Sequence, residues 1–228
     1  MSAASSVPVL DFTAPGAPIE MRPAPRSAVR TSFVDLKQAF DFAAAASMAL
    51  LFAPFLLVAA VAIEMTSRGP AFYVQWRVGR HGRLFRMYKL RTMVRDAESS
   101  SAPVWAADAD PRVTPIGRVL RATHLDELPQ IFNVLKGEMS LVGPRSERPM
   151  FVRTFARSIP HYAARLEVRP GITGLAQVCQ GYDRSLRDVR RKLAYDLVYI
   201  RRMCWLVDAR ILAATLRHAV PLSGKAMA

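Results

Sequence analysis

The chain has 228 residues, enough for one ordinary domain with appendages and a sizeable core. Its 32 lysines and arginines against 18 acidic residues give a formal charge of +14, which favours a polyanionic partner: an anionic membrane surface, a phosphorylated substrate or nucleic acid. The two cysteines, with no CxxC or Cys/His cluster, exclude a disulfide framework and a zinc site of the usual spacing.

The first 32 residues are predicted to form a disordered tail, because they are rich in Ala, Pro and Ser and show no apolar period. A helix is expected to begin near Phe33 and to continue to residue 64 as a membrane segment. Its central part, Phe42–Ile63, contains 22 residues without a charge. As a helix this part is about 33 Å long, which matches the bilayer's hydrocarbon core of about 30 Å.

The topology of this membrane segment is left open by its flanks and its proline. Basic residues precede it and follow it, so the positive-inside tendency acts on both ends. Pro54 near the middle removes one helical hydrogen bond. Two topologies are therefore possible. The segment could break at Pro54 and enter and leave on the same face, or it could cross the bilayer as an ordinary kinked span.

Beyond the membrane segment, the chain alternates between surface-like strands and amphipathic helices. The stretch AFYVQWRVGRHGRLFRMYKLRTM predicts strand or turn structure at the membrane surface, and residues 96–110 predict a loop. Two helical patterns follow, the second closed by Gly137. A further amphipathic helix is predicted over Leu186–Arg202. Residues 203–220 are apolar but carry three charges, which predicts an amphipathic helix lying in the membrane interface.

Two adjacent carboxylates, Asp126 and Glu127, stand out in a strongly basic chain. Spacing alone favours Asp126 as a helix N-cap, with Pro129 in the first turn. That role does not account for Glu127, whose repulsion from its neighbour calls for a cation. A carboxylate with substrate phosphates is the Mg²⁺ pattern, and an ionised aspartate can also act as a nucleophile in aspartyl-phosphate chemistry.

Three arginines occur near turn-forming residues around this pair: Arg121, Arg145 at the end of GPR, and Arg169 at the start of RPGITG. Arginine matches phosphate oxygens in bidentate fashion, and a glycine such as Gly171 lets backbone N–H groups approach an anion. Together they favour a diphosphate substrate. The histidines lack helical metal-binding partners, so we expect no histidine-ligated metal.

The motifs YKLRTM, DELPQIFNVLKGEMSLVGPR, RPGITGLAQV and YDLVYI, in this order, resemble the bacterial sugar transferases, small monotopic phosphoglycosyl transferases of the exopolysaccharide-initiating type. The resemblance extends from about Phe33 to Val220. The chain departs from the usual family pattern at Ser146, where GPRP is typical, and at His124, where a serine is typical. Neither departure removes a reactive group.

The resemblance implies an α/β fold that is mostly helical and irregular with little sheet. It implies a monotopic protein in the bacterial cytoplasmic (inner) membrane, with a re-entrant N-terminal helix kinked at Pro54 and a cytosolic catalytic domain over residues 65–202. It also implies transfer of a sugar 1-phosphate from a UDP-sugar to polyprenyl phosphate with release of UMP. Inner-membrane lipids are expected partners, nucleic acid is not, and self-association is allowed.

The resemblance also implies roles for particular residues. Asp126 would be the nucleophile and Glu127 the Mg²⁺ ligand. Phosphate or uridine contacts would come from Arg121, Arg145 and Arg169, and Lys89 and Arg91 match a basic K-x-R motif near the membrane. Two alternatives remain. Asp126 could serve as a general base in a direct displacement, or the chain could be a non-enzymatic, membrane-tethered basic module that binds anionic lipid or nucleic acid.

Overall fold

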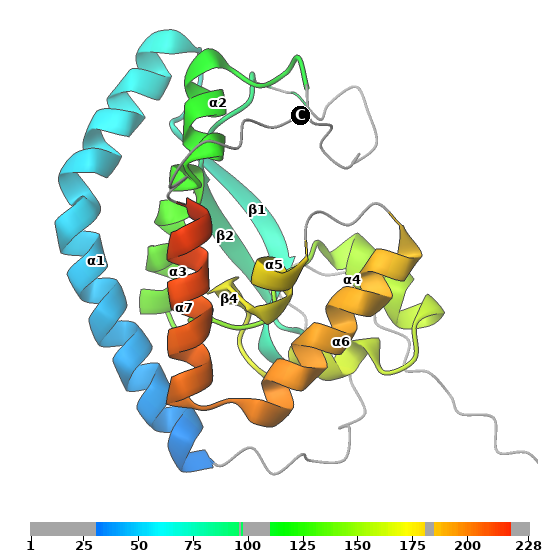
Figure 1. Ribbon diagram of the computed structural model, residues 1–228. Helices are drawn as coiled ribbons and strands as arrows, with labels where there is room; N and C mark the ends of the chain where they lie inside the picture. Colours follow the sequence, from blue (N-terminus) through cyan, green and yellow to red (C-terminus); the bar gives the residue numbers. More distant parts are fainter. Residues whose placement is uncertain (1–30, 96, 98–109, 181–184, 220–228) are drawn as a thin grey trace, which may run out of the picture.

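A computed structural model describes residues 31–95, 97, 110–180 and 185–219 of the chain. The predicted tail, apart from its last two residues, and most of the predicted loop over residues 96–110 lie outside this part. The described residues are mostly helical with little sheet, as predicted (Figure 1). The sheets are one antiparallel hairpin, β1 (Phe72–Val78) with β2 (Leu84–Leu90), and one short parallel pair, β3 (Ser140–Val142) with β4 (Gly171–Thr173).

The remaining elements are helical and connect these two small sheets. The α-helices are α1 (Thr31–Thr66), α2 (Pro115–Ala122), α3 (Ile131–Leu135), α4 (Pro149–Ser158), α5 (Leu175–Cys179), α6 (Leu186–Arg202) and α7 (Trp205–Ala219); the 3₁₀ helices are η1 (Arg80–Gly82), η2 (Leu125–Gln130) and η3 (Tyr162–Glu167). The amphipathic helix predicted over Leu186–Arg202 is confirmed as α6. The alternating stretch after the membrane segment is confirmed as the β1–β2 hairpin.

Helix α1 runs along one side of the molecule and bends part-way along its length (Figure 1). It continues as a helix through Pro54, because neighbouring residues in a long apolar helix can absorb the lost hydrogen bond. Its buried residues lie along one stripe, and most of its other apolar side chains are exposed, among them Leu50 (80%) and Met65 (82%). The helix is long and apolar enough to cross a membrane, and its exposed surface suits lipid. This indicates membrane association.

The first half of α1 is fixed to the rest of the fold by a buried polar network. Lys37 lies 2.7 Å from a carboxylate oxygen of Asp208 on α7 and 3.4 Å from Asp41. The hydroxyl of Ser140 donates to Asp41, and that of Tyr199 donates to Asp208. Asp208 is one of the three charges that predicted an interfacial position for residues 203–220, and it points into the protein. The other two, Arg210 and Arg217, are exposed.

The hairpin and the helices after it form the part of the core that supports the candidate site. Ile131 and Val134 of α3 pack against Phe85 and Met87 of β2. Asn133, which is fully buried, accepts from the backbone N–H of Tyr88 and donates to the carbonyl of Arg86, along the free edge of β2. The segment from η2 to α3 is thereby held against β2, and this contact brings the carboxylate pair next to the strand.

Candidate active site

The carboxylate pair lies at the start of η2, and the turn before it sets its direction. His124 has a left-handed backbone (φ 55°) and occupies the N-cap position of η2. Asp126 and Glu127 therefore fall in the first turn of the helix, where the partial positive charge of the helix start favours them. The capping interpretation of Asp126 is wrong. Its carboxylate makes no hydrogen bond or ion pair with any residue that the structure describes.

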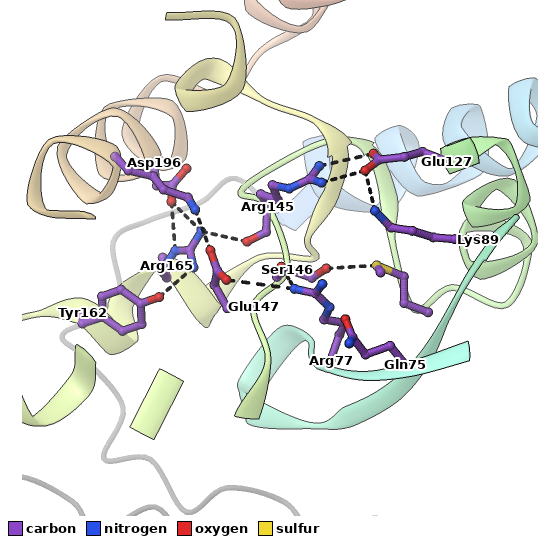
Figure 2. Close-up of polar contacts among 12 residues, drawn as sticks. Gln75, Arg77, Lys89, Glu127, Arg145, Ser146, Glu147, Tyr162, Arg165 and Asp196 are labelled. Atoms are coloured by element: carbon purple, nitrogen blue, oxygen red, sulfur yellow. Dashed lines mark hydrogen bonds and ion pairs between the residues drawn. The ribbon is translucent and has the colours of Figure 1, made fainter. Parts of the chain in front are cut away.

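Glu127 is held between two cations (Figure 2). Its Oε1 lies 2.6 Å from Nζ of Lys89 and 2.6 Å from Nη2 of Arg145, and its Oε2 lies 3.2 Å from Nη1 of Arg145. Burial alone would raise the pKa of Glu127, but the charges and hydrogen bonds of Arg145 and Lys89 outweigh it and hold the pKa well below 4.5. Glu127 is therefore ionised at neutral pH and accepts bonds from both cations.

Asp126 has the opposite environment. Its side chain is almost completely buried, and burial raises its pKa above 3.8, a shift that Lys89 opposes and the charge of Glu127 reinforces. Burial also lowers the pKa of Lys89, with the charge of Glu127 working against that shift. Two adjacent carboxylates thus differ in their partners: one is paired twice, and the other faces the site without a bonded cation.

The loop that carries Arg145 is fixed by a second buried network (Figure 2). The guanidinium of Arg165 forms an ion pair with Asp196 of α6 at 2.8 Å, donates to the carbonyl oxygen of Arg145 at 2.8 Å and donates to the hydroxyl of Tyr162. Asp196 is 1% exposed, so this pair is among the most buried polar contacts of the protein. Arg165 therefore holds the backbone of Arg145 in place, a role that the sequence did not reveal.

Two further ion pairs hold the end of the same loop. Glu147 bonds to Lys192 of α6, and Arg77 of β1 approaches Glu147 and donates to the carbonyl oxygen of Ser146. Ser146, at which the chain departs from the motif of the resemblance, is 5% exposed and donates to the sulfur of Met87. The loop is thus fixed by polar contacts with β1, β2 and α6.

The glycines near Arg145 serve close backbone packing. The N–H of Gly171 donates to the carbonyl oxygen of Pro144, and that of Gly143 donates to Thr173. A Cβ built on Gly171 would lie 2.1 Å from the backbone nitrogen of Gly143. The GPR and RPGITG motifs therefore lie against each other, and the Gly171 N–H is used inside the protein instead of facing an anion.

The remaining predicted site residues lie in two different places. Arg121, on the last turn of α2, is one of the cations that lower the pKa of Asp126, although it forms no ion pair with that carboxylate in the described structure. Arg91 points away toward the end of α1, where it donates to the carbonyl oxygens of Ser67 and Arg68. Arg169 lines a small cavity with Gln38, Asp41 and Lys136, beside the first half of α1. The structure therefore brings Lys89, Arg121 and Arg145 to the carboxylates, and it does not bring Arg91 or Arg169 there.

The residues present can take part in a Mg²⁺ site only together with a substrate. The described residues contain no group of three or more His, Cys, Asp or Glu side chains that could hold a metal. Glu127 Oε2 accepts a single bond from Arg145, which leaves one of its lone pairs available, and the Asp126 carboxylate is unbonded. One or two carboxylates that share the ion with substrate phosphates match the usual Mg²⁺ arrangement.

Comparison with known proteins decides the family. The model for bacterial sugar transferases matches residues 32–221. The chain belongs to the bacterial sugar transferase family. Similar members include a UDP-N-acetylgalactosamine-undecaprenyl-phosphate N-acetylgalactosaminephosphotransferase of Aeromonas hydrophila, 46% identical over 80% of this chain and 43% of the relative. A UDP-glucose:undecaprenyl-phosphate glucose-1-phosphate transferase of Caulobacter vibrioides is 44% identical over 85% of this chain and 71% of its own.

A smaller relative matches the transferase over nearly all of its own length. The exopolysaccharide production protein PSS of Rhizobium leguminosarum bv. phaseoli is 39% identical over 79% of this chain and 92% of the relative. The chain spans less than half of the Aeromonas relative and most of the Rhizobium one. The family match over residues 32–221 includes the hairpin, the carboxylate pair and the Arg145 loop.

Proposed function

We propose that this transferase moves a sugar 1-phosphate from a UDP-sugar to undecaprenyl phosphate and releases UMP, as the first membrane step in the assembly of an exopolysaccharide, capsule or O-antigen-type glycan. The observation that carries the proposal is the asymmetric carboxylate pair. Glu127 is neutralised by Lys89 and Arg145, whereas Asp126 is buried beside them without a bonded partner. A site of this kind offers a nucleophile next to cations that bind phosphate.

In the proposed first step, an oxygen of Asp126 attacks the sugar-linked phosphorus of the UDP-sugar. The bond from this phosphorus to the bridging oxygen breaks, and UMP leaves with that oxygen and its electron pair. In the second step, a phosphate oxygen of undecaprenyl phosphate attacks the same phosphorus and releases the Asp126 carboxylate. The reaction consumes one diphosphate and one monophosphate and forms one diphosphate and one monophosphate. Because the bonds broken and formed are of the same kind, catalysis rests mainly on positioning and charge stabilisation.

The cations of the site have separate tasks in this scheme. Arg121 and the partly exposed Arg145 are guanidinium groups next to the carboxylates, and guanidinium groups bind phosphate oxygens well. Lys89 holds Glu127, and its charge opposes the rise that burial causes in the pKa of Asp126, which favours the ionised form of the nucleophile. Mg²⁺, held by Glu127 together with the diphosphate, would neutralise charge on the leaving group.

The membrane arrangement belongs to the same proposal. Undecaprenyl phosphate resides in the bilayer and UDP-sugars are cytosolic, so the site must face the cytosol beside the membrane. A re-entrant α1, bent at Pro54, places both of its basic flanks on that side. The apolar side chains that α1 exposes would then lie in one leaflet, and the search for the lipid acceptor is reduced to two dimensions.

The test of the proposal is UMP release from a panel of UDP-sugars by membranes that contain the wild-type protein or Asp126→Asn. The asparagine side chain has nearly the same shape and cannot attack phosphorus, so this variant should lose turnover while it remains folded and membrane-bound. Activity within tenfold of wild type in Asp126→Asn would overturn the assignment of the nucleophile. If Asp126 were instead a general base, labelled UMP would not exchange into the UDP-sugar without acceptor, because no covalent intermediate would form.

The same measurement separates the enzymatic proposal from the basic-module alternative. A module that only binds anionic lipid gains nothing from a buried carboxylate pair. Under that alternative, wild-type membranes release no UMP with any donor, and Asp126→Asn binds anionic vesicles as wild type does.

A further inference from the structure

Arg121 is the one cation beside Asp126 whose terminal nitrogens have no partner among the described residues, and a single residue fixes its position. Its Nε donates to the hydroxyl of Thr92 at 2.8 Å. An arginine has five N–H donors, so this bond uses one of them and leaves the outer fork of the guanidinium free. Arg121 is close enough to lower the pKa of Asp126 without pairing to it. Its fork is available to an incoming anion.

Thr92 also holds the other end of the helix that carries Arg121. Its carbonyl oxygen accepts from the backbone N–H of Thr114 at 3.0 Å and from the Thr114 hydroxyl at 3.3 Å. Thr114 is the N-cap of α2 and accepts from the N–H of Gly117. A single residue therefore anchors the first and the last turn of α2, one through its backbone and one through its side chain.

The face of α2 that meets Thr92 is shaped for this contact. Gly117 and Arg121 are four residues apart and lie on the same side of the helix. A Cβ built on Gly117 would lie 2.1 Å from the carbonyl oxygen of Thr92, so only glycine allows the helix to approach this closely. The close approach is what lets the Arg121 side chain bond back to the Thr92 hydroxyl.

The residue before Thr92 connects this arrangement to the membrane helix. The buried guanidinium of Arg91 donates to the carbonyl oxygens of Ser67 and Arg68 and to the hydroxyl of Ser67. Carbonyl groups at the end of a helix lack hydrogen-bond donors within the helix. Arg91 supplies such donors to the backbone just after α1 ends. The end of β2 is thereby tied to the end of α1 on one side and to α2 on the other.

We infer that Thr92 is a positioning residue that fixes the Arg121 guanidinium beside Asp126 for the diphosphate of the donor. This inference rests on the proposed function for the identity of the donor, but not for the contact itself. Thr92 does not touch the reacting atoms in this scheme. It acts through Arg121, and Arg91 gives it a fixed position relative to the end of the membrane helix.

The experiment compares Thr92→Val, which removes the hydroxyl at nearly constant volume, with Thr92→Ser, which keeps it. A matched control is Thr154→Val, because Thr154 is an exposed threonine on α4 whose hydroxyl, among the described residues, bonds only to the carbonyl of Met150. The probe is UDP, whose affinity is measured on the full chain in nanodiscs, and turnover with the UDP-sugar is measured in parallel. Thr92→Val should weaken UDP binding about tenfold, the effect of one hydrogen bond to a charged group. Thr92→Ser should recover most of it, and Thr154→Val should change nothing.

A purely structural role for Thr92 is separated by a double-mutant cycle on UDP affinity. In an Arg121→Ala background, Thr92→Val should cost less than twofold, because the residue through which it acts is gone. Equal losses in both backgrounds, or a Thr92→Val protein that binds UDP as wild type does, would overturn the inference. If Thr92→Val fails to fold, Thr92→Ala gives the same comparison. Wild-type protein that binds UDP but transfers no sugar phosphate would overturn the proposed function, while the cycle on UDP affinity would still decide the role of Thr92.

Discussion

Replacement of Glu127 by glutamine tests the central ion pair, because it keeps the shape of the side chain and removes its charge. Glu127 accepts three bonds from Lys89 and Arg145. Removal of one partner from a buried pair costs about 3–5 kcal/mol. The Arg145 side chain is 35% exposed and can recover hydration, and the glutamine oxygen still accepts one bond. We therefore expect the free energy of unfolding to fall by about 2–3 kcal/mol at neutral pH.

The pH dependence of this loss identifies its electrostatic origin. The pKa of Glu127 in the folded protein lies below its ordinary value of 4.5. The ionised form therefore favours folding, and this contribution is present in full above pH 4.5 and is lost as the pH falls through the lower, folded-state pKa. The stability difference between wild type and Glu127→Gln should accordingly be constant near neutral pH and shrink in acid.

Urea denaturation in detergent micelles, followed by far-UV circular dichroism, measures this difference at several pH values. Glu64→Gln is a suitable control, because Glu64 is exposed on α1 and has no ion pair in the described structure. It should change the free energy of unfolding by less than about 0.5 kcal/mol. A Glu127→Gln protein as stable as wild type at pH 7, or a loss that stays the same in acid, would refute the electrostatic argument.

Two further outcomes follow from the structure, and a third follows from the proposed topology. Lys89→Met should move the acid limb of kcat/KM to higher pH, because Lys89 lowers the pKa of an Asp126 that must be ionised to attack; a pH–rate profile that keeps its acid limb would contradict this. Gly171→Ala should abolish stable folding, seen as loss of the cooperative unfolding transition, because its Cβ would meet backbone atoms at 2.1 and 2.3 Å. In a re-entrant protein, a cysteine at Ser5 should be labelled only after the inner membrane is permeabilised, and Pro54→Ala should expose it to the periplasm; periplasmic labelling of the otherwise wild-type chain would exclude the re-entrant arrangement.

The parts of the fold that the sequence predicted are those specified by local patterns. Alternating apolar and polar residues predicted strand or turn structure where the β1–β2 hairpin lies, although not its pairing, and an amphipathic repeat predicted α6 with the correct bounds. The long apolar run predicted α1. In each case the signal lies within the element itself, because one face must be buried against its neighbours.

The site could be predicted only as a set of residues, because their partners are distant in the sequence. Lys89 meets Glu127 across 38 positions, and Arg165 meets Asp196 across 31. Spacing alone favours Asp126 as a cap, because no local pattern shows that His124 adopts a left-handed backbone and starts the helix earlier. These contacts depend on how η2 packs on β2, which periodicity does not specify.

The charges that meet around the carboxylate pair explain why a diphosphate suits this site better than a neutral ligand. Three cations, Lys89, Arg121 and Arg145, surround two carboxylates, so the cluster has one more cation than anion when all five groups are charged. The cations are not used equally. Lys89 and Arg145 are bonded to Glu127, and Arg121 is held by the neutral hydroxyl of Thr92. A hydroxyl orients a guanidinium without neutralising it, whereas a carboxylate in the same place would compete with the substrate for the charge. Two cations share the single charge of Glu127, so the excess positive charge lies there. Arg121 adds a guanidinium whose outer nitrogens have no partner among the described residues, beside the carboxylate of Asp126. An anionic phosphate group would be drawn to these cations and so to the proposed nucleophile.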